Sequence, residues 1–106
     1  MSSKQMIYTV HDVKGETFMP PFFVPSKGLA IRAFEDCINS PDHHFGKHPA
    51  DYTLFSLGYF DTDTGEIVQA DRVSVGNGIE FVKPENMKPL GNSQNANSSR
   101  SPDEDR

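Results

Sequence analysis

One amphipathic helix with a proline-rich entry constrains this fold more than any other sequence feature. Between Ser26 and Asn39, at about 100° per residue, apolar side chains gather on one side of a helix and charged side chains on the other. The Ser26 hydroxyl can accept a hydrogen bond from the first turn, and Pro41 forces the residue before it out of the helical region. We therefore expect a helix that covers one face of a sheet. Its apolar arc comprises Leu29, Ala30, Ile31, Ala33, Phe34, Cys37 and Ile38.

Stretches on both sides of this helix have the composition of β-strands. Residues 6–13 are rich in β-branched and aromatic side chains, and residues 17–24 return antiparallel to them after a turn in which Gly15 can supply a positive φ. Pro20-Pro21 interrupts the returning strand, because proline has no N–H to donate. Residues 52–60 carry apolar groups on both faces, which predicts a central strand with Leu57 and Tyr59 on the same side.

The remaining sequence completes a small α+β domain. After a hairpin loop at residues 61–66, a strand returns over residues 66–70, and residues 73–82 suggest a short final hairpin. The order strand, strand, helix, strand, strand predicts one amphipathic helix packed on an antiparallel sheet of four to five strands, all within residues 1–83. Residues 84–106 are rich in Asn, Ser and Pro, and we predict a disordered tail there. A core this small is compatible with a homodimer.

Three histidines between residues 43 and 48 invite a metal hypothesis. Gly46 and Pro49 argue against a helix that would align His44 and His48, and no CxxC or HExxH motif accompanies them. We therefore predict a solvated loop and no metal. The loop at residues 61–66 lacks the glycine and glutamate spacing of a calcium site, so we expect a plain turn.

Catalysis has no sequence signal either. Cys37 lies on the apolar face of the helix, where a free cysteine behaves as a small hydrophobe. Since no nucleophile–base pair can be argued, we expect no enzyme, no catalytic residue and no cofactor. No signal peptide or transmembrane run is visible, which predicts a cytoplasmic location and no membrane partner.

A net charge of -5 argues against a domain built to neutralise many phosphates. Binding to single-stranded DNA would then depend on stacking aromatics and a few local cations. The run PPFFVP is either a rigid connector that pins the helix to the sheet or an exposed aromatic platform. The candidate nucleic-acid-binding residues are Phe22, Phe23, Lys14, Lys27, Arg32 and Lys47.

A resemblance to a known family extends over roughly residues 6–70. Two segments, MPPFFVPSKGLAIRAFEDCINSP and FGKHPADYTLFSLGYFDTDTGEI, are similar to the small non-structural protein of gokushoviruses, which are single-stranded DNA phages of the Microviridae. The matching pattern comprises the PPFF run, Ala33-Phe34, His48-Pro49, the strand Asp51-Tyr52-Thr53-Leu54-Phe55, Gly58 and Phe60-Asp61.

The resemblance implies a non-capsid phage protein in the cytoplasm of an infected bacterium. It also implies a role in viral DNA replication, including the switch to single-stranded DNA synthesis and packaging. Two hypotheses stay open. The protein binds single-stranded DNA weakly by itself, or it is a protein–protein adaptor that acts on the replication initiator or the procapsid while its partner holds the DNA.

Overall fold

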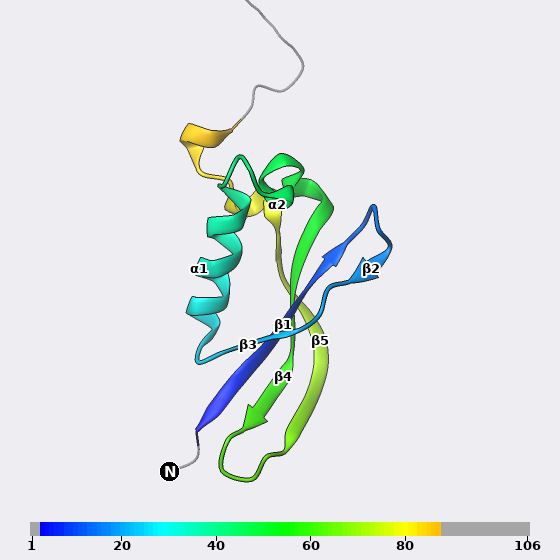
Figure 1. Ribbon diagram of the computed structural model, residues 1–106, viewed down its shortest axis with the longest axis vertical. Helices are drawn as coiled ribbons and strands as arrows, with labels where there is room; N and C mark the ends of the chain where they lie inside the picture. The colour runs from blue at the N-terminus through cyan, green and yellow to red at the C-terminus, as the bar shows by residue number, and fades with distance from the viewer. Residues whose placement is uncertain (1–2, 88–106) are drawn as a thin grey trace, which may run out of the picture.

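A computed structural model describes residues 3–87, which form an antiparallel sheet of five strands with one main helix on one of its faces (Figure 1). The predicted α+β class and the order of strands and helix are confirmed. The strands and helices are β1 (Lys4–Asp12), β2 (Thr17–Phe18), β3 (Phe22–Val24), α1 (Lys27–Ile38), α2 (His44–Lys47), β4 (Tyr52–Asp61) and β5 (Ile67–Asn77). Three 3-10 turns complete the fold: η1 (Pro49–Asp51), η2 (Gly78–Phe81) and η3 (Pro84–Asn86).

The strand order β2-β1-β4-β5 places β4 inside the sheet, as its two apolar faces predicted. β2 and β3 both pair with β1, and Pro20-Pro21 separates them. The chain between these two short strands stays attached to β1 through Met19. The Met19 N–H donates to the Val10 carbonyl at 2.9 Å, and the buried Thr9 hydroxyl donates to the Met19 carbonyl at 2.6 Å.

The turn between β1 and β2 differs from the sequence prediction in one detail. The positive φ falls on Glu16, at 55°, and not on Gly15. One Asp12 carboxylate oxygen accepts from the Lys14 and Gly15 N–H groups, both at 3.1 Å. This side chain therefore organises the first part of the turn, and the left-handed position comes one residue later.

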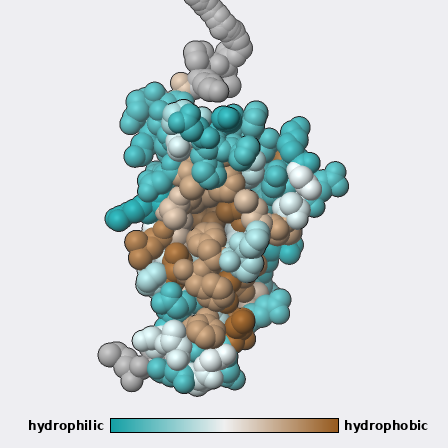
Figure 2. All heavy atoms as spheres, viewed as in Figure 1, coloured by the Kyte–Doolittle hydropathy of each residue, from teal (hydrophilic) through white to brown (hydrophobic). Residues whose placement is uncertain are grey.

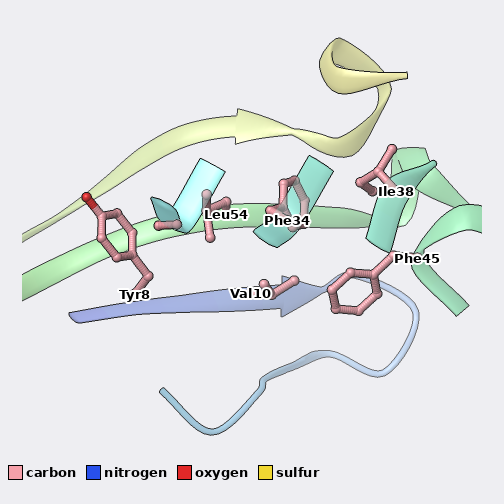
Figure 3. Close-up of a cluster of buried hydrophobic side chains, with 7 residues drawn as sticks. Tyr8, Val10, Phe34, Ile38, Phe45 and Leu54 are labelled. Carbon is pink, nitrogen blue, oxygen red and sulfur yellow. The ribbon is translucent and has the colours of Figure 1, made fainter. Parts of the chain in front are cut away.

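The core lies between α1 and the strands β1 and β4 (Figure 3). Ser26 caps α1 as predicted, accepting from the Leu29 N–H at 3.3 Å. The buried line on α1 is narrower than the predicted arc, because Leu29 and Ala33 remain exposed. A line of residues four apart meets the sheet, since these positions share one helix face. The buried cluster comprises Tyr8, Val10, Ala30, Phe34, Ile38, Phe45 and Leu54.

Two segments predicted as loop or strand are short helices. Around the histidines the predicted solvated loop is wrong: α2 forms one turn, and the His43 ring nitrogen Nδ1 accepts from the Phe45 N–H at 3.0 Å. Phe45 is buried against Phe34, with ring centroids 5.8 Å apart, which explains why this turn is ordered. Gly46 permits it, because a β-carbon there would overlap the Ser40 carbonyl.

The predicted final hairpin is also wrong. β5 continues without a break to Asn77, and η2 follows in place of another strand. Asn77 accepts from the Ile79 N–H at 3.0 Å, while the Glu80 carboxylate accepts from the Asn77 N–H at 2.8 Å. This reciprocal capping favours a helical turn over the tight hairpin that Gly76 and Gly78 suggested.

Asn39, the residue after α1, ties the C-terminal part of the described chain to the helix. Its amide nitrogen donates to the carbonyls of Glu35 and Phe81 at 2.9 and 3.0 Å. Its oxygen accepts from the Lys83 N–H at 2.8 Å and from the Asn86 amide at 3.0 Å. The described structure thus runs past the predicted domain boundary at residue 83, and residues 88–106 of the predicted disordered tail lie outside it. Neither helix of residues 3–87 has the length and apolar character of a membrane-spanning segment.

Candidate nucleic-acid interface

The two faces of the sheet are distinguished by the pairing register. Residues paired across an antiparallel ladder point to the same side. Tyr8 and Val10 point toward α1, so Ile7, Thr9 and His11 point to the opposite side. We call this opposite side the open face, because α1 packs on the other side of the sheet (Figure 1). The register adds these partners to the open face: Phe18 of β2, Phe23 of β3, and Phe55 and Phe60 of β4.

At one end of the open face, three rings and one guanidinium form what we call the Phe18 cluster. The Phe18 ring lies 4.5 Å from His11 and 5.7 Å from Phe55, measured between centroids. The Arg72 guanidinium carbon lies over both phenylalanines, 4.9 Å from the Phe18 centroid and 5.7 Å from that of Phe55. Arginine over an aromatic face is a stabilising cation–π arrangement that leaves N–H donors at the edge of the guanidinium.

At the other end, Phe23 and Phe60 form the Phe23 pair. Their centroids are 6.1 Å apart, and the rings are nearly perpendicular at 83°. Phe18 and Phe23 are 42% and 48% exposed, and Ile67 on the same face is 66% exposed. Apolar side chains that gather on one face in this way are typical of interaction surfaces. Figure 2 shows apolar side chains at the surface in the middle of the molecule in this view, with hydrophilic residues above and below.

A β-bulge in β4 brings Phe60 to this face. Ile7 pairs with Gly58 and Tyr8 pairs with Ser56, so Leu57 has no partner on β1. The extra residue reverses the alternation, which places Tyr59 on the helix side and Phe60 on the open face. The prediction that Leu57 and Tyr59 share a side is therefore wrong. Gly58 is required here, because its φ is 145° and a β-carbon would overlap the Val68 carbonyl.

The two phenylalanines of the PPFFVP run lie on opposite sides of the sheet. Phe22 matches the predicted connector that pins the chain to the core, and Phe23 has the exposure of the predicted aromatic platform. Phe22 pairs with Tyr8, lies 6.2 Å from that ring between centroids, and packs against the buried cluster. Phe23 pairs with Ile7 and lies on the open face. Adjacent residues of a strand point to opposite sides, so one ring pins the chain to the core while the other remains available.

The predicted cations are spread over the molecule. Lys14 lies in the turn after β1, and Lys27 and Arg32 lie on α1. Lys47 ends α2 and lines a hollow of about 730 Å³ beside η2 and η3, away from Phe23. The cation that accompanies the aromatic rings is Arg72, which the sequence analysis missed. Its position follows from the pairing of β5 with β4. Ser74 pairs with Phe55 on the open face, and Arg72 lies two residues before Ser74, so its side chain points to the same face.

The thiol of Cys37 does not have the environment of a nucleophile. Cys37 is half-buried against the core, and burial together with the nearby Asp36 carboxylate raises the pKa of its thiol. A raised pKa keeps the thiol protonated, whereas a nucleophilic cysteine needs a lowered one. Within residues 3–87, no group of three His, Cys, Asp or Glu side chains is arranged to hold a metal ion.

Comparison with known proteins places the chain in a family. The model of the family described as Phage ORF5 protein matches residues 5–81. These residues run from the second residue of β1 to the end of η2 and include every strand and helix named above except η3. Neither the curated proteins nor the solved structures contain a significant match. Because the match covers most of its length, the chain belongs to the Phage ORF5 protein family and is a phage protein.

Proposed function

We propose that this phage protein binds single-stranded DNA weakly on the open face of its sheet and thereby assists viral DNA replication. The observation that carries the proposal is the Phe18 cluster, in which the exposed Phe18 ring and the half-buried Phe55 ring lie beside the Arg72 guanidinium. Unstacked bases bind aromatic rings at about 1–3 kcal/mol per base, with little dependence on sequence. A sheet that displays such rings on an uncovered face offers bases a flat surface.

The acidic balance of the chain shapes how this binding would work. With a net charge of -5, the protein neutralises few phosphates, so most of the affinity comes from stacking. Arg72 supplies a cation at the place where the bases stack, which lets one phosphate or base edge be held without a basic surface elsewhere. The expected affinity is low and changes little with salt.

The resemblance to the small non-structural protein of gokushoviruses supplies the biological setting of the proposal. The protein acts in the cytoplasm of the infected bacterium, without catalysis and without a cofactor. It binds newly displaced single strands and so favours the switch from duplex replicative DNA to single-stranded DNA synthesis and packaging. Weak binding suits this role, because the strand must later be released into the procapsid.

A second candidate function is that of a protein–protein adaptor. The same open face exposes large apolar side chains, including Ile67 at 66%, and aromatic residues are enriched in protein interfaces. The partner would be the replication initiator, a procapsid protein or a second copy of this chain. In this case the DNA is held by the partner, and the net negative charge poses no difficulty.

The test is an anisotropy titration of a labelled oligothymidylate with the purified full chain at about 50 and 200 mM salt. We expect measurable binding at low salt and a slope corresponding to fewer than three released counterions, because few phosphates are contacted. Phe18→Ala and Phe55→Ala should each weaken binding about tenfold, since each removes a stacking surface. Leu29→Ala is the matched control, because Leu29 is an exposed apolar residue on α1.

The outcomes separate the two candidates. A slope of six or more counterions would contradict the stacking model, because it requires a phosphate-binding surface. Unchanged affinity in folded Phe18→Ala and Phe55→Ala variants would remove the open face as the DNA site. No binding at low salt, combined with capture of the replication initiator or a procapsid protein from infected cells, would favour the adaptor.

A further inference from the structure

The two edges of the sheet differ in how well they are protected against pairing with another strand. At one edge, β2 and β3 have two and three residues, and Pro20-Pro21 separates them. At the other edge, β5 has 11 residues and contains neither proline nor lysine. Short strands, prolines and lysines are common means of keeping an edge from pairing with a second chain. Within residues 3–87 β5 pairs with β4 alone, so its outer row of backbone N–H and C=O groups is open to another strand.

The exposed part of β5 is a continuous stretch at its start. Residues 67–74 are all exposed, whereas the last three residues of the strand are buried or half-buried. The 3-10 turn η2 lies against this last part, since a β-carbon on Gly76 would meet the ring of Phe81. The exposed stretch thus has its midpoint between Ala70 and Asp71, and we compared it with a copy of itself running antiparallel about that point.

Self-pairing about this midpoint keeps every side chain on its own face. The register of β5 on β4 places these side chains on the open face: Ile67, Gln69, Arg72 and Ser74. The same register places Val68 and Val73 on the helix side. The self-paired stretch opposes Ile67 to Ser74 of the second copy, Gln69 to Arg72, and Val68 to Val73. Opposite residues of an antiparallel pair must point to the same side of the sheet, and all three pairs do so.

An irregularity in the middle of β5 makes this match possible. The pairing of β5 with β4 shifts between Gln69 and Val73, so the alternation of faces reverses there. A regular strand, paired about a midpoint between two residues, would oppose side chains of different faces. Bulges often protect an edge. Here the irregularity of one copy would face that of the other, so neither half of the pairing loses its register.

The side chains that meet in this register suit one another. Val68 and Val73 are 36% and 56% exposed, and self-pairing brings the two together twice, once on each side of the twofold axis. Pairs of β-branched side chains directly opposite each other stabilise antiparallel strands. The charged residues of β5 are Asp71 and Arg72, one of each sign, so the edge has no net charge that would repel its copy.

We propose that two copies of this chain join their β5 edges into one continuous sheet, with the two β5 strands antiparallel and paired over residues 67–74. The strand itself identifies a second copy as the occupant, because the exposed stretch matches its own reverse in length, in face and in apolar character. The inference goes beyond the proposed function, since it uses the edge of the sheet and leaves the open face uncovered. An interface of one strand pair is small, so the dimer is weak and reversible.

The experiment measures the mass of the full chain by sedimentation equilibrium between about 1 and 500 µM, the range in which weak interfaces associate. The wild type should form a dimer within this range. An acidic double variant carries Val68→Asp and Val73→Asp, and a basic one carries Val68→Lys and Val73→Lys. Each alone should raise the dissociation constant of the dimer about tenfold or more, because like charges lie directly opposite. An equal mixture of the two should form the heterodimer. Val13→Asp is the matched control, because Val13 is an exposed valine in the turn after β1.

A second readout uses the wild type alone and applies even where a charged variant does not fold. Amide hydrogen exchange of residues 67–74 should slow as the protein concentration rises, while exchange at the opposite edge, in β2 and β3, stays unchanged. A monomer over the whole concentration range would overturn the proposal. A dimer that persists in either charged variant, a mixture of folded variants that forms no heterodimer, or exchange at residues 67–74 that does not depend on concentration would also overturn it. The proposed function would stand in each case, because its test is the binding of oligothymidylate to the open face.

Discussion

The two faces of this sheet carry similar apolar and aromatic residues, but these residues are buried on one face and partly exposed on the other. On the helix side, Tyr8 and Leu54 are 3% and 0% exposed, and they belong to one buried cluster with Phe34 of α1 (Figure 3). On the open face, Phe18 and Phe23 keep nearly half of their surface exposed. Both faces hold apolar and aromatic side chains, and only one of them has a helix to cover it.

This difference shows that an alternating apolar pattern predicts burial only on a face that another element covers. Apolar groups on both faces of β4 predict that both faces are buried, and within residues 3–87 there is one long helix to bury them. The apolar side chains of β4 that α1 does not cover therefore lie on the open face. Exposed apolar patches of this kind are typical of interaction surfaces. The helix side therefore holds the fold together, and the open face is available for function.

The strongest test of this difference between the two faces is to replace one phenylalanine on each face with alanine and to compare the losses of stability. Phe34→Ala should lower the free energy of unfolding by about 3–5 kcal/mol, because it leaves a cavity in the buried cluster. That loss is comparable to the whole stability of a small domain. Urea unfolding of the variant gives the number. A melting temperature within a few degrees of the wild type would mean that α1 does not cover the core as described.

A second substitution tests the hydrogen bonds by which Asn39, at the end of α1, holds the chain around η2 and η3. Asn39→Ala removes one hydrogen bond to Glu35 within α1 and three that join the end of α1 to Phe81, Lys83 and Asn86. It should cost about 1–3 kcal/mol, because two backbone carbonyls and one N–H lose a partner. Asn86→Ala removes only the bond between the two side-chain amides, which is exposed, so it serves as the control and should cost less than about 1 kcal/mol. Equal effects of the two substitutions would show that the hydrogen bonds of Asn39 to Phe81 and Lys83 contribute nothing to the free energy of unfolding.

The sequence predicted the helix side well, because its signals are local. The Ser26 cap, the helix end at Asn39 and the central place of β4 follow from capping, proline sterics and alternation. The short helices at His44–Lys47 and Gly78–Phe81 were missed, since each depends on a contact made only in the fold. Phe45 needs the ring of Phe34, and Asn77 needs the Glu80 carboxylate.

The open face was predicted only in part for a related reason. Phe23 was identified from its proline neighbours, but its partner Phe60 faces the same way only because of the bulge at Leu57. Arg72 lies beside Phe18 through the register of two strand pairs that are distant in sequence. A bulge shifts every later side chain to the other face, and alternation alone cannot locate it.

Alkaline pH offers a third test, with a smaller effect. Burial raises the pKa of the Tyr8 phenol above its ordinary value of 10.0, because the charged form would be desolvated on the helix side. The folded pKa thus exceeds the unfolded one, so the associated stability is complete below about pH 10 and is lost as the pH rises through the folded pKa. Tyr8→Phe should flatten the decline in unfolding free energy as the pH rises above about 10. If the variant and the wild type decline in parallel, Tyr8 is not buried in the folded state.

The smallest expected effect concerns stability after substitution on the open face. Phe18→Ala removes ring contacts with His11, Phe55 and Arg72, but 42% of the ring already faces solvent. Only part of the hydrophobic stabilisation of a buried ring is therefore at stake, and the expected loss of unfolding free energy is below about 1 kcal/mol. Urea unfolding at neutral pH, beside Phe34→Ala, measures it directly. A loss as large as that of Phe34→Ala would mean that the open face is part of the core, for example because a second copy of the chain covers it in solution. In that case the loss should depend on protein concentration, since the stability of a dimer does. A small loss that is independent of concentration would leave the rings of the open face free to bind a ligand.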